Sequence, residues 1–343
     1  MVPEDSAFQY NISPSKSSEM IITQTPLRIS LFGGGSDLPG YYARYGGRVL
    51  TTAIDKYIYC IVKKRFDDKI YINYSQKEIV DSVDQIKHDL VREAMKLVGI
   101  DSGIEISFLA DIPSGGSGLG SSSSVTVGVL NALYLYLGQA MDADHLAQLA
   151  CQIEIDLLNK PIGVQDQYIA AFGGTRLIEF DSSGIHVHQP ITSPEILEDL
   201  TSHLMVFFTG ITRDSSSVLD EQQQKISRNQ PLIQQMTDQA SEGYKLLQEG
   251  EIKKLGHLLN ETWLLKKKLS SKVSNPLIDR MYKRAIVAGA WGGKISGAGN
   301  GGFLTLLVPG HKRKTVRQAL SKYKQLPIIL SQDGTKAIFN IRR

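Results

Sequence analysis

The sequence has few cysteines, no long apolar run and no excess of charge of one sign. Its two cysteines, Cys60 and Cys151, lie far apart and form no CxxC pair, which argues against a disulfide framework and a structural zinc site. No uninterrupted apolar stretch approaches the roughly 18 residues that cross a bilayer, and no basic segment followed by an apolar run opens the chain. These absences predict a cytoplasmic protein that is not secreted and does not enter a membrane.

The charges are nearly balanced. The chain carries 38 basic and 35 acidic residues, a formal net charge of +3, and neither sign forms a long block. A dedicated nucleic-acid binder concentrates basic residues on one face or segment, so this class is disfavoured. The seven histidines show no HExxH or other ligand spacing, and we assign none of them chemistry.

Length and patterning predict a two-domain α+β protein. A chain of 343 residues, 42% of them apolar, is long enough for about two domains with buried cores. Strand patterns and helix patterns occur in both halves. We predict a disordered extension at residues 1–19, a first domain at 20–195 and a second at 196–343. The polar, proline-containing segment 189–199 is the expected boundary.

Three predicted elements frame the candidate site. A strand begins at Met20 and is interrupted by Pro26. An apolar helix is predicted at 121–137, directly after a glycine-rich loop. A further helix, capped by Asp144, carries Glu154.

Glycine is concentrated in three segments, which cover residues 33–40, 115–120 and 289–302. The middle one lies in 113–124 (PSGGSGLGSSSS), just before the predicted apolar helix. Glycine lets backbone approach a ligand closely, and the first turn of a helix presents unpaired N–H groups, so this loop suits a phosphate. It lacks the GxxxxGK[ST] lysine, and no GxGxxG is followed by a ribose-binding acid. Taken alone, the loop is also compatible with a purely structural start of a helix.

Three motifs in this order resemble those of the GHMP kinases, the family of galactokinase, homoserine kinase, mevalonate kinase and phosphomevalonate kinase. Segment 113–124 is similar to the loop that wraps the phosphates of ATP. Segment 26–37 (PLRISLFGGGSD) is similar to the N-terminal substrate motif, and 294–302 (KISGAGNGG) to the C-terminal glycine motif. The resemblance implies a ribosomal-protein-S5-like N-terminal domain, a ferredoxin-like C-terminal domain and an enzyme that uses ATP and Mg²⁺. The ATP-binding residues that it implies are Pro113, Gly115, Gly116, Ser117, Gly118, Leu119, Gly120, Ser121, Ser122 and Ser123.

The sequence departs from the family pattern in two places. Between Pro113 and Gly118 it has four residues where the family has three, which leaves the geometry of 114–117 open. Gly34 and Gly35 replace the Glu-His pair that contacts the sugar in galactokinases, which disfavours galactose. The form FGGGSD followed by Tyr-Tyr instead resembles the heptose kinases, which phosphorylate the anomeric hydroxyl of D-glycero-D-manno-heptose 7-phosphate.

The resemblance implies substrate contacts from the first and third motifs and from a loop after a predicted buried strand. These residues are Ser36, Asp37, Tyr42, Arg213, Gly297, Ala298 and Gly299. A guanidinium among hydroxyls suits a phosphate, so Arg213 is predicted to bind the substrate's own phosphate. A solvated surface arginine is the alternative. The lysines at 266–268 are either a solvated helix face or include one substrate contact.

The predicted catalytic acid is Asp166. Segment 163–167 (GVQDQ) is similar to the Gly-Ile-Met-Asp-Gln of galactokinases, whose aspartate is catalytic. A carboxylate can accept or orient the proton of the attacking hydroxyl, and a nearby Arg28 would keep it ionised. The alternative is that Asp166 only caps the next helix.

The predicted metal ligands are Ser122 and Glu154. Glu154 lies 12 residues before Asp166, the spacing at which galactokinases carry their Mg²⁺-binding glutamate. Ser122 aligns with the hydroxyl ligand of the second motif, and hard oxygen ligands suit Mg²⁺. Two alternatives stay open, that Glu154 faces the surface and that Asp156 is the ligand.

These features predict an ATP- and Mg²⁺-dependent sugar kinase that converts a heptose 7-phosphate to the 1,7-bisphosphate, in the synthesis of nucleotide-activated heptose. Fucose, another hexose or a sugar 1-phosphate is the alternative substrate. A non-catalytic sugar sensor is expected to lack the acid or the glycine loop, and both are present. A dinucleotide-dependent oxidoreductase lacks its ribose-binding fingerprint. The predicted partners are ATP and a sugar phosphate, and the chain is a monomer or homodimer.

Overall fold

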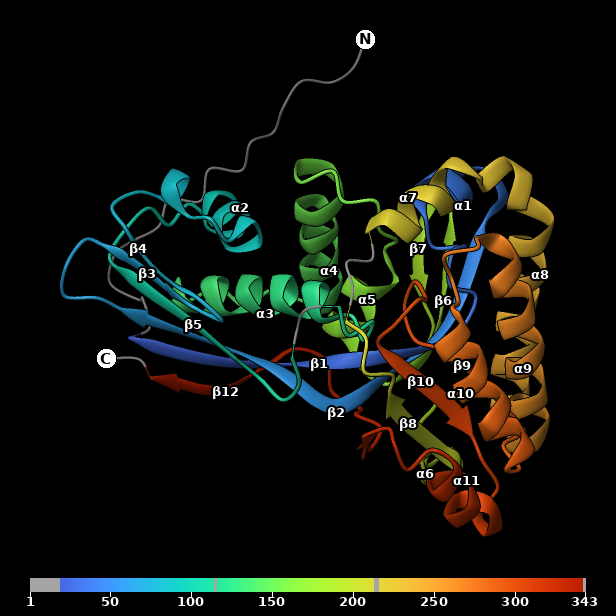
Figure 1. Cartoon of the computed structure of the whole chain (residues 1–343). Coiled ribbons are helices and arrows are strands. Elements are labelled where there is room, and N and C mark those ends of the chain that lie inside the picture. The colour runs from blue at the N-terminus through green and yellow to red at the C-terminus, as the bar shows by residue number, and fades with distance from the viewer. Residues whose placement is uncertain (1–18, 114–115, 213–215, 342–343) are drawn as a thin grey trace.

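The computed structural model describes residues 19–113, 116–212 and 216–341. Within these ranges the strands form one sheet of eight and one of four (Figure 1). The larger sheet contains β1 (Met20–Phe32), β2 (Gly47–Lys64), β3 (Ile70–Asn73), β4 (Lys77–Val80), β5 (Ile104–Ala110), β6 (Thr175–Asp181), β7 (Gly184–Val187) and β12 (Lys336–Ile341). The smaller sheet contains β8 (Leu204–Phe208), β9 (Gly292–Ile295), β10 (Phe303–Leu307) and β11 (Gln325–Leu326).

The helices connect and cover these sheets, which makes the fold α+β as predicted. The helices of the first half are α1 (Pro39–Tyr45), α2 (Asp89–Val98), α3 (Ser121–Tyr136), α4 (Ala143–Cys151) and α5 (Gln165–Phe172). Those of the second half are α6 (Pro194–His203), α7 (Ser216–Gln224), α8 (Ile226–Gln248), α9 (Ile252–Leu269), α10 (Pro276–Val287) and α11 (Arg313–Ala319). Among the described residues, no helix is both long and apolar enough to cross a membrane.

Strand β1 lies between β12 and β2 in the larger sheet and leads into the site. It pairs with β2 over its whole length, and the register shifts between Pro26 and Leu27. Proline lacks the N–H that the hydrogen-bond ladder needs, so the pairing register shifts at this point while the strand continues. The predicted interruption at Pro26 is therefore a register shift inside one strand.

Helix α3 lies across β1 and β2 (Figure 1). Almost every side chain of α3 is buried, as expected for a helix that is apolar on all sides. At Gly128 the helix touches the strand so closely that a Cβ would lie 2.7 Å from Thr25 Oγ1. Thr23 Oγ1 also donates to the Gly128 carbonyl at 2.9 Å. Nearer its N-terminus, Ser124 Oγ donates to the Pro26 carbonyl at 2.8 Å, which holds this end of α3 close to Arg28.

The predicted helix after residue 142 differs from the structure at both ends. Asp142, not Asp144, is its N-cap, because the Asp142 carboxylate accepts the His145 N–H. Beyond Cys151 the helix widens into a π-helix at Gln152–Leu157, which carries Glu154. A π-turn inside a helix often marks a functional position.

The second half also departs from the predicted organisation. Segment 189–199, expected as a polar connection, contains the start of α6. Strand β12 pairs antiparallel with β1 in the larger sheet, so the last strand returns to the first (Figure 1). Glu19, placed in the predicted extension, donates its N–H to the Ile341 carbonyl at 2.9 Å. The boundary between 195 and 196 stays a prediction, and the chain after it is not confined to one unit in space. Residues 1–18 lie outside the described ranges.

Candidate active site

A cavity of about 450 Å³ lies where both halves of the chain meet. It is bounded by residues between 28 and 38, the start of α3 with its preceding loop, and residues 160–166. Leu219 and Gln222 of α7, Lys266 of α9, and the loop 297–298 complete the wall. Segments from all parts of the chain thus contribute to one site.

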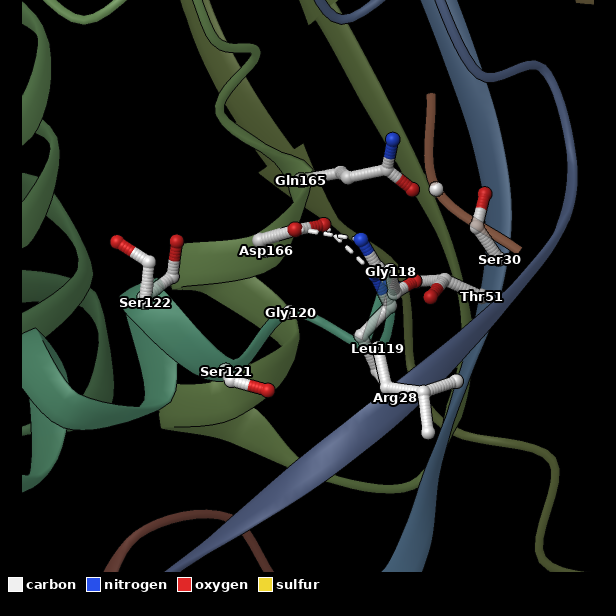
Figure 2. A network of polar contacts seen from close by, with 12 residues as sticks. Arg28, Ser30, Thr51, Gly118, Leu119, Gly120, Ser121, Ser122, Gln165 and Asp166 are labelled. Atoms are coloured by element: carbon white, nitrogen blue, oxygen red, sulfur yellow. Dashed lines mark hydrogen bonds and ion pairs between the residues drawn. The ribbon is translucent and has the colours of Figure 1, made fainter. Parts of the chain in front are cut away.

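Arg28 and Asp166 form the central ion pair of this cavity (Figure 2). Arg28 Nε donates to Asp166 Oδ1 at 2.7 Å, and Nη2 donates to Oδ2 at 2.5 Å. The third guanidinium nitrogen, Nη1, donates to the Gly118 carbonyl at 2.7 Å. This two-point contact holds the carboxylate in one orientation, facing the cavity. The predicted juxtaposition of Arg28 and Asp166 is confirmed.

Asp166 is not a helix cap. It is the second residue of α5, whose N-cap position is Val164, and within the described residues no side chain caps that end. The Asp166 carboxylate is instead held by Arg28. This arrangement leaves Asp166 available for an acceptor hydroxyl.

The glycine loop before α3 is shaped by left-handed glycines and by the third glycine segment. Gly116, Gly118 and Gly120 all have φ between 68° and 78°. A Cβ on Gly118 would lie 2.6 Å from the Ser296 carbonyl oxygen, and one on Gly302 would lie 2.3 Å from the Ser117 oxygen. The two glycine segments therefore pack backbone against backbone, which a side chain would prevent.

The start of α3 presents a polar, positively polarised surface to the cavity. Ser121, Ser122 and Ser123 occupy its first turn and line the cavity. Helix N-termini favour anions because their N–H groups lack partners within the helix and the helix dipole points its positive end there. Leu119 is buried, and its carbonyl accepts the Arg28 N–H at 3.0 Å. The loop can thus hold phosphate groups next to the Arg28–Asp166 pair.

Glu154 and Ser122 lie in direct contact beside this helix start. The Ser122 hydroxyl donates to Glu154 Oε1, and Ser123 Oγ donates to Oε2 at 2.8 Å. Gln167 Nε2 also donates to Oε2, at 2.7 Å. Glu154 is completely buried, and this burial raises the pKa of its carboxyl while the serine hydrogen bonds oppose the rise. The alternative of a surface-facing Glu154 is wrong, and Asp156 is the exposed acid.

The chemistry of these two ligands fits Mg²⁺. A carboxylate and a hydroxyl side by side offer two hard oxygen donors, of which the Ser122 hydroxyl belongs to the cavity wall. In the described part of the chain, this site included, no group of three or more His, Cys, Asp or Glu side chains could hold a metal. Mg²⁺ bound through two protein oxygens and substrate phosphates needs no such group.

Of the predicted substrate residues, Asp37, Gly297 and Ala298 line the cavity. Asp37 Oδ1 accepts the Gly35 N–H at 2.9 Å, and Oδ2 accepts from Gln165 Nε2 at 2.8 Å. Burial raises the pKa of the Asp37 carboxyl, and the hydrogen bond from Gly35 opposes the rise.

Several other predicted residues do not reach the cavity. The buried Ser36 hydroxyl contacts the Gly33 and Arg48 carbonyls and the Arg48 N–H, so it shapes the turn after β1. The Tyr42 ring packs against Phe180. Gly299 is required because a Cβ would lie 2.4 Å from the Val273 oxygen. Pro113 is exposed and outside the cavity wall, and Gly115 and Arg213 lie outside the described residues.

The structure also places polar residues in the cavity wall that are not among the predicted site residues. Ser30, Gln165 and Gln222 line the cavity, and Lys266 is the member of the lysine run that reaches it. Lys266 Nζ donates to the Gly297 carbonyl at 2.5 Å. Gln165 adjoins Asp166 in segment 163–167 (GVQDQ), so the position of this motif could have indicated Gln165 as a site residue. Gln222 lies in the polar helix α7, whose sequence carries no pattern that marks a site residue.

Lys294 lies directly behind the cavity wall. It is buried, and its Nζ donates to the Ser30 carbonyl at 2.5 Å. Burial holds the pKa of Lys294 well below its ordinary value, and the positive charges of Lys266 and Arg28 lower it further. Three basic side chains and two carboxyl groups thus surround one small space.

Comparison with known proteins agrees with this geometry. The family description "GHMP kinases N terminal domain" matches residues 84–174, and "GHMP kinases C terminal" matches 244–325. The chain belongs to the GHMP kinase family. It is an ATP-dependent phosphotransferase.

Two relatives and one solved structure place the chain within this family. It is 34% identical to a D-glycero-alpha-D-manno-heptose 7-phosphate kinase of Campylobacter jejuni, over 88% of this chain and 93% of the relative. It is 28% identical to an L-fucokinase/L-fucose-1-P guanylyltransferase of Bacteroides fragilis, over 85% of this chain and 35% of that longer protein. The crystal structure of a D-glycero-D-manno-heptose 1-phosphate kinase from Bacteroides thetaiotaomicron superposes with a TM-score of 0.78 at 27% identity. That match covers 93% of this chain and 99% of the other.

Proposed function

We propose that this protein is a sugar kinase that phosphorylates the anomeric hydroxyl of D-glycero-D-manno-heptose 7-phosphate to give the 1,7-bisphosphate. The observation that carries the kinase chemistry is the two-point Arg28–Asp166 pair beside the glycine loop. Support for this substrate comes from the 34% identity to the Campylobacter heptose 7-phosphate kinase over most of both chains.

In the proposed mechanism the sugar hydroxyl approaches Asp166, which accepts or orients its proton while the oxygen attacks the γ-phosphorus of ATP. The bond from the γ-phosphorus to the β,γ-bridging oxygen breaks, and ADP leaves with that oxygen. Arg28 holds the carboxylate in place and adds positive charge near the transferred group. The loop 116–120 and the first turn of α3 bind the ATP phosphates. Ser122 and Glu154 would hold Mg²⁺, which neutralises charge on the phosphates when bound. Arg213 stays the predicted ligand of the sugar's own phosphate.

A second candidate substrate is a heptose 1-phosphate. It is favoured by the structural similarity to the Bacteroides heptose 1-phosphate kinase. The two substrates differ in where the existing phosphate lies, so they differ in which hydroxyl must face Asp166.

The test is a substrate panel that measures ADP release with heptose 7-phosphate, heptose 1-phosphate, L-fucose, galactose and mevalonate. We expect the highest kcat/KM with heptose 7-phosphate, and phosphorus NMR should show a new anomeric phosphate. A higher kcat/KM with heptose 1-phosphate or fucose would overturn this substrate in favour of that one. Absence of ADP release with every sugar would overturn the sugar kinase itself.

A further inference from the structure

Three polar side chains converge on the space above Gly34. A Cβ built on Gly34 would lie 3.6 Å from Ser30 Oγ, 3.8 Å from Gln165 Nε2 and 3.9 Å from Lys266 Nζ. These side chains come from β1, α5 and α9, which are far apart in sequence. Gly34 has no left-handed φ, so its backbone accepts alanine. Because glycine has no Cβ, this position leaves free space between the three side chains.

Polar atoms of this wall lack hydrogen-bond partners. Ser30 Oγ, Gln165 Oε1 and Gln222 Nε2 have none among the residues that the structure describes. Their residues are only 3%, 8% and 5% exposed, and all three line the cavity. Buried polar atoms are normally paired, because an unpaired one costs free energy. Figure 2 shows the ends of the Ser30 and Gln165 side chains close together, beside the Arg28–Asp166 pair. These orphaned atoms point to a bound ligand.

The mixture of donors and acceptors identifies the chemical class of that ligand. Gln165 Oε1 accepts, Gln222 Nε2 donates, and the Ser30 hydroxyl does either. The Asp37 carboxylate, bonded to Gln165 Nε2, adds an acceptor. Phosphate oxygens mainly accept, so they would leave Gln165 Oε1 without a donor. Hydroxyl groups of a sugar donate and accept at once, so they match this wall.

We propose that Ser30, Gly34, Gln165, Gln222 and Lys266 form a hydroxyl-binding subsite that decides which sugar this kinase accepts. Gly34 sets the space for the sugar, and the two amides and the serine hydroxyl bind its hydroxyls. The inference rests on the proposed function in that the acceptor is a sugar. It does not depend on which sugar that is.

The first test fills the subsite with Gly34→Ala. The added methyl takes the space that the sugar needs while staying at ordinary contact distance from its neighbours. We expect the KM for the sugar to rise roughly tenfold or more, with the KM for ATP unchanged within about twofold. Gly310→Ala is the matched control, since Gly310 is exposed, has no left-handed φ and has no atom within 4 Å of its Cβ position. An unchanged KM for the sugar in Gly34→Ala overturns the subsite.

The second test removes one amide with Gln165→Met, which keeps the side-chain length. We expect the KM for the sugar to rise about 2- to 10-fold. In a series of monodeoxy sugars, one analogue should be penalised in the wild type but not in Gln165→Met, because its missing hydroxyl is the one that Gln165 binds. Gln318→Met, on an exposed residue, serves as control. Equal penalties for every analogue in both proteins would contradict the assignment.

These outcomes are separate from those of the proposed function. If the wild type turns over fucose or heptose 1-phosphate in place of heptose 7-phosphate, the proposed substrate fails. The variants are then measured with the sugar that is turned over. Melting curves accompany each variant. If Gly34→Ala does not fold, Ser30→Ala replaces it, with a sugar KM raised about 2- to 10-fold as the expected result and an unchanged KM as the overturning one.

Discussion

In the proposed function, the phosphate side and the sugar side of the cavity bind their ligands by different means. On the phosphate side, the contacts come from backbone groups of one continuous segment, the loop 116–120 and the first turn of α3. On the sugar side, they come from side chains of β1, α5, α7 and α9, which the fold brings together. Arg28 and Asp166 lie between them. Backbone recognition requires glycines at fixed spacing, whereas side-chain recognition requires only that distant residues meet.

The largest effect is expected when Asp166, the group that both sides share, is substituted. Asp166→Asn should lower kcat by ~10²–10⁴, because the hydroxyl loses its proton acceptor, while ATP binding changes little since the glycine loop stays intact. Steady-state kinetics and calorimetric titration of ATP measure the two effects. Turnover close to that of the wild type would remove Asp166 from the mechanism.

The next largest effect tests whether close backbone packing shapes the phosphate side of the cavity. Gly118 has φ of 74°, and its Cβ would lie 2.6 Å from the Ser296 oxygen. Gly118→Ala should therefore displace the loop and raise the KM for ATP by roughly 100-fold. Gly250→Ala is a matched control, with φ of 73° but no atom within 4 Å of the Cβ position. Equal effects of both variants on the KM for ATP would show that backbone strain alone, not loop packing, matters.

A smaller effect concerns the metal at the edge of the phosphate side. Glu154→Gln replaces a charged hard ligand by a neutral one, so half-maximal rate should require at least roughly tenfold more Mg²⁺. A magnesium titration of the initial rate measures this. Asp156→Asn, on the exposed acid of the same segment, should leave the titration unchanged. Identical titrations for Glu154→Gln and the wild type would disprove the metal assignment.

The smallest effect concerns Lys294, behind the sugar side. Its pKa is lowered in the folded chain and is ~10.4 in the unfolded chain. Between these two values unfolding takes up a proton, so wild-type stability falls as the pH falls through this window and levels off below the folded pKa. Lys294→Met removes this titration. The free energy of unfolding of the variant relative to the wild type should therefore rise as the pH falls below about 10, with a slope of at most about 1.4 kcal/mol per pH unit.

Urea unfolding at several pH values measures this difference. The exposed Lys253→Met is the control, and its difference from the wild type should not depend on pH. A pH-independent difference for Lys294→Met would mean that the buried ammonium keeps its ordinary ionisation.

The two sides of the cavity also differ in how well they can be predicted. The glycine segments and Asp166 were found because their spacing is local and repeats a family pattern. Arg28 was paired with Asp166 through that same pattern, and the structure confirms their contact. Gln222 is not predicted because nothing near it in the sequence marks it as a cavity residue. Ser30 lies within the first motif, 26–37, but the motif alone does not separate it from its neighbours. Lys266 could not be separated from Lys267 and Lys268 by sequence, since burial alone distinguishes it.

The sequence by itself determined the α+β class, the glycine loop, the start of α3 and the acid beside it, because glycine spacing, helix periodicity and motif order are local properties. Only the tertiary structure decided that β12 closes against β1, that Glu154 is buried next to Ser122, and that Ser36 and Tyr42 turn away from the cavity. These outcomes depend on which distant segments pack together. Packing is set by the balance of burial and hydrogen bonding over the whole chain, which no local pattern contains.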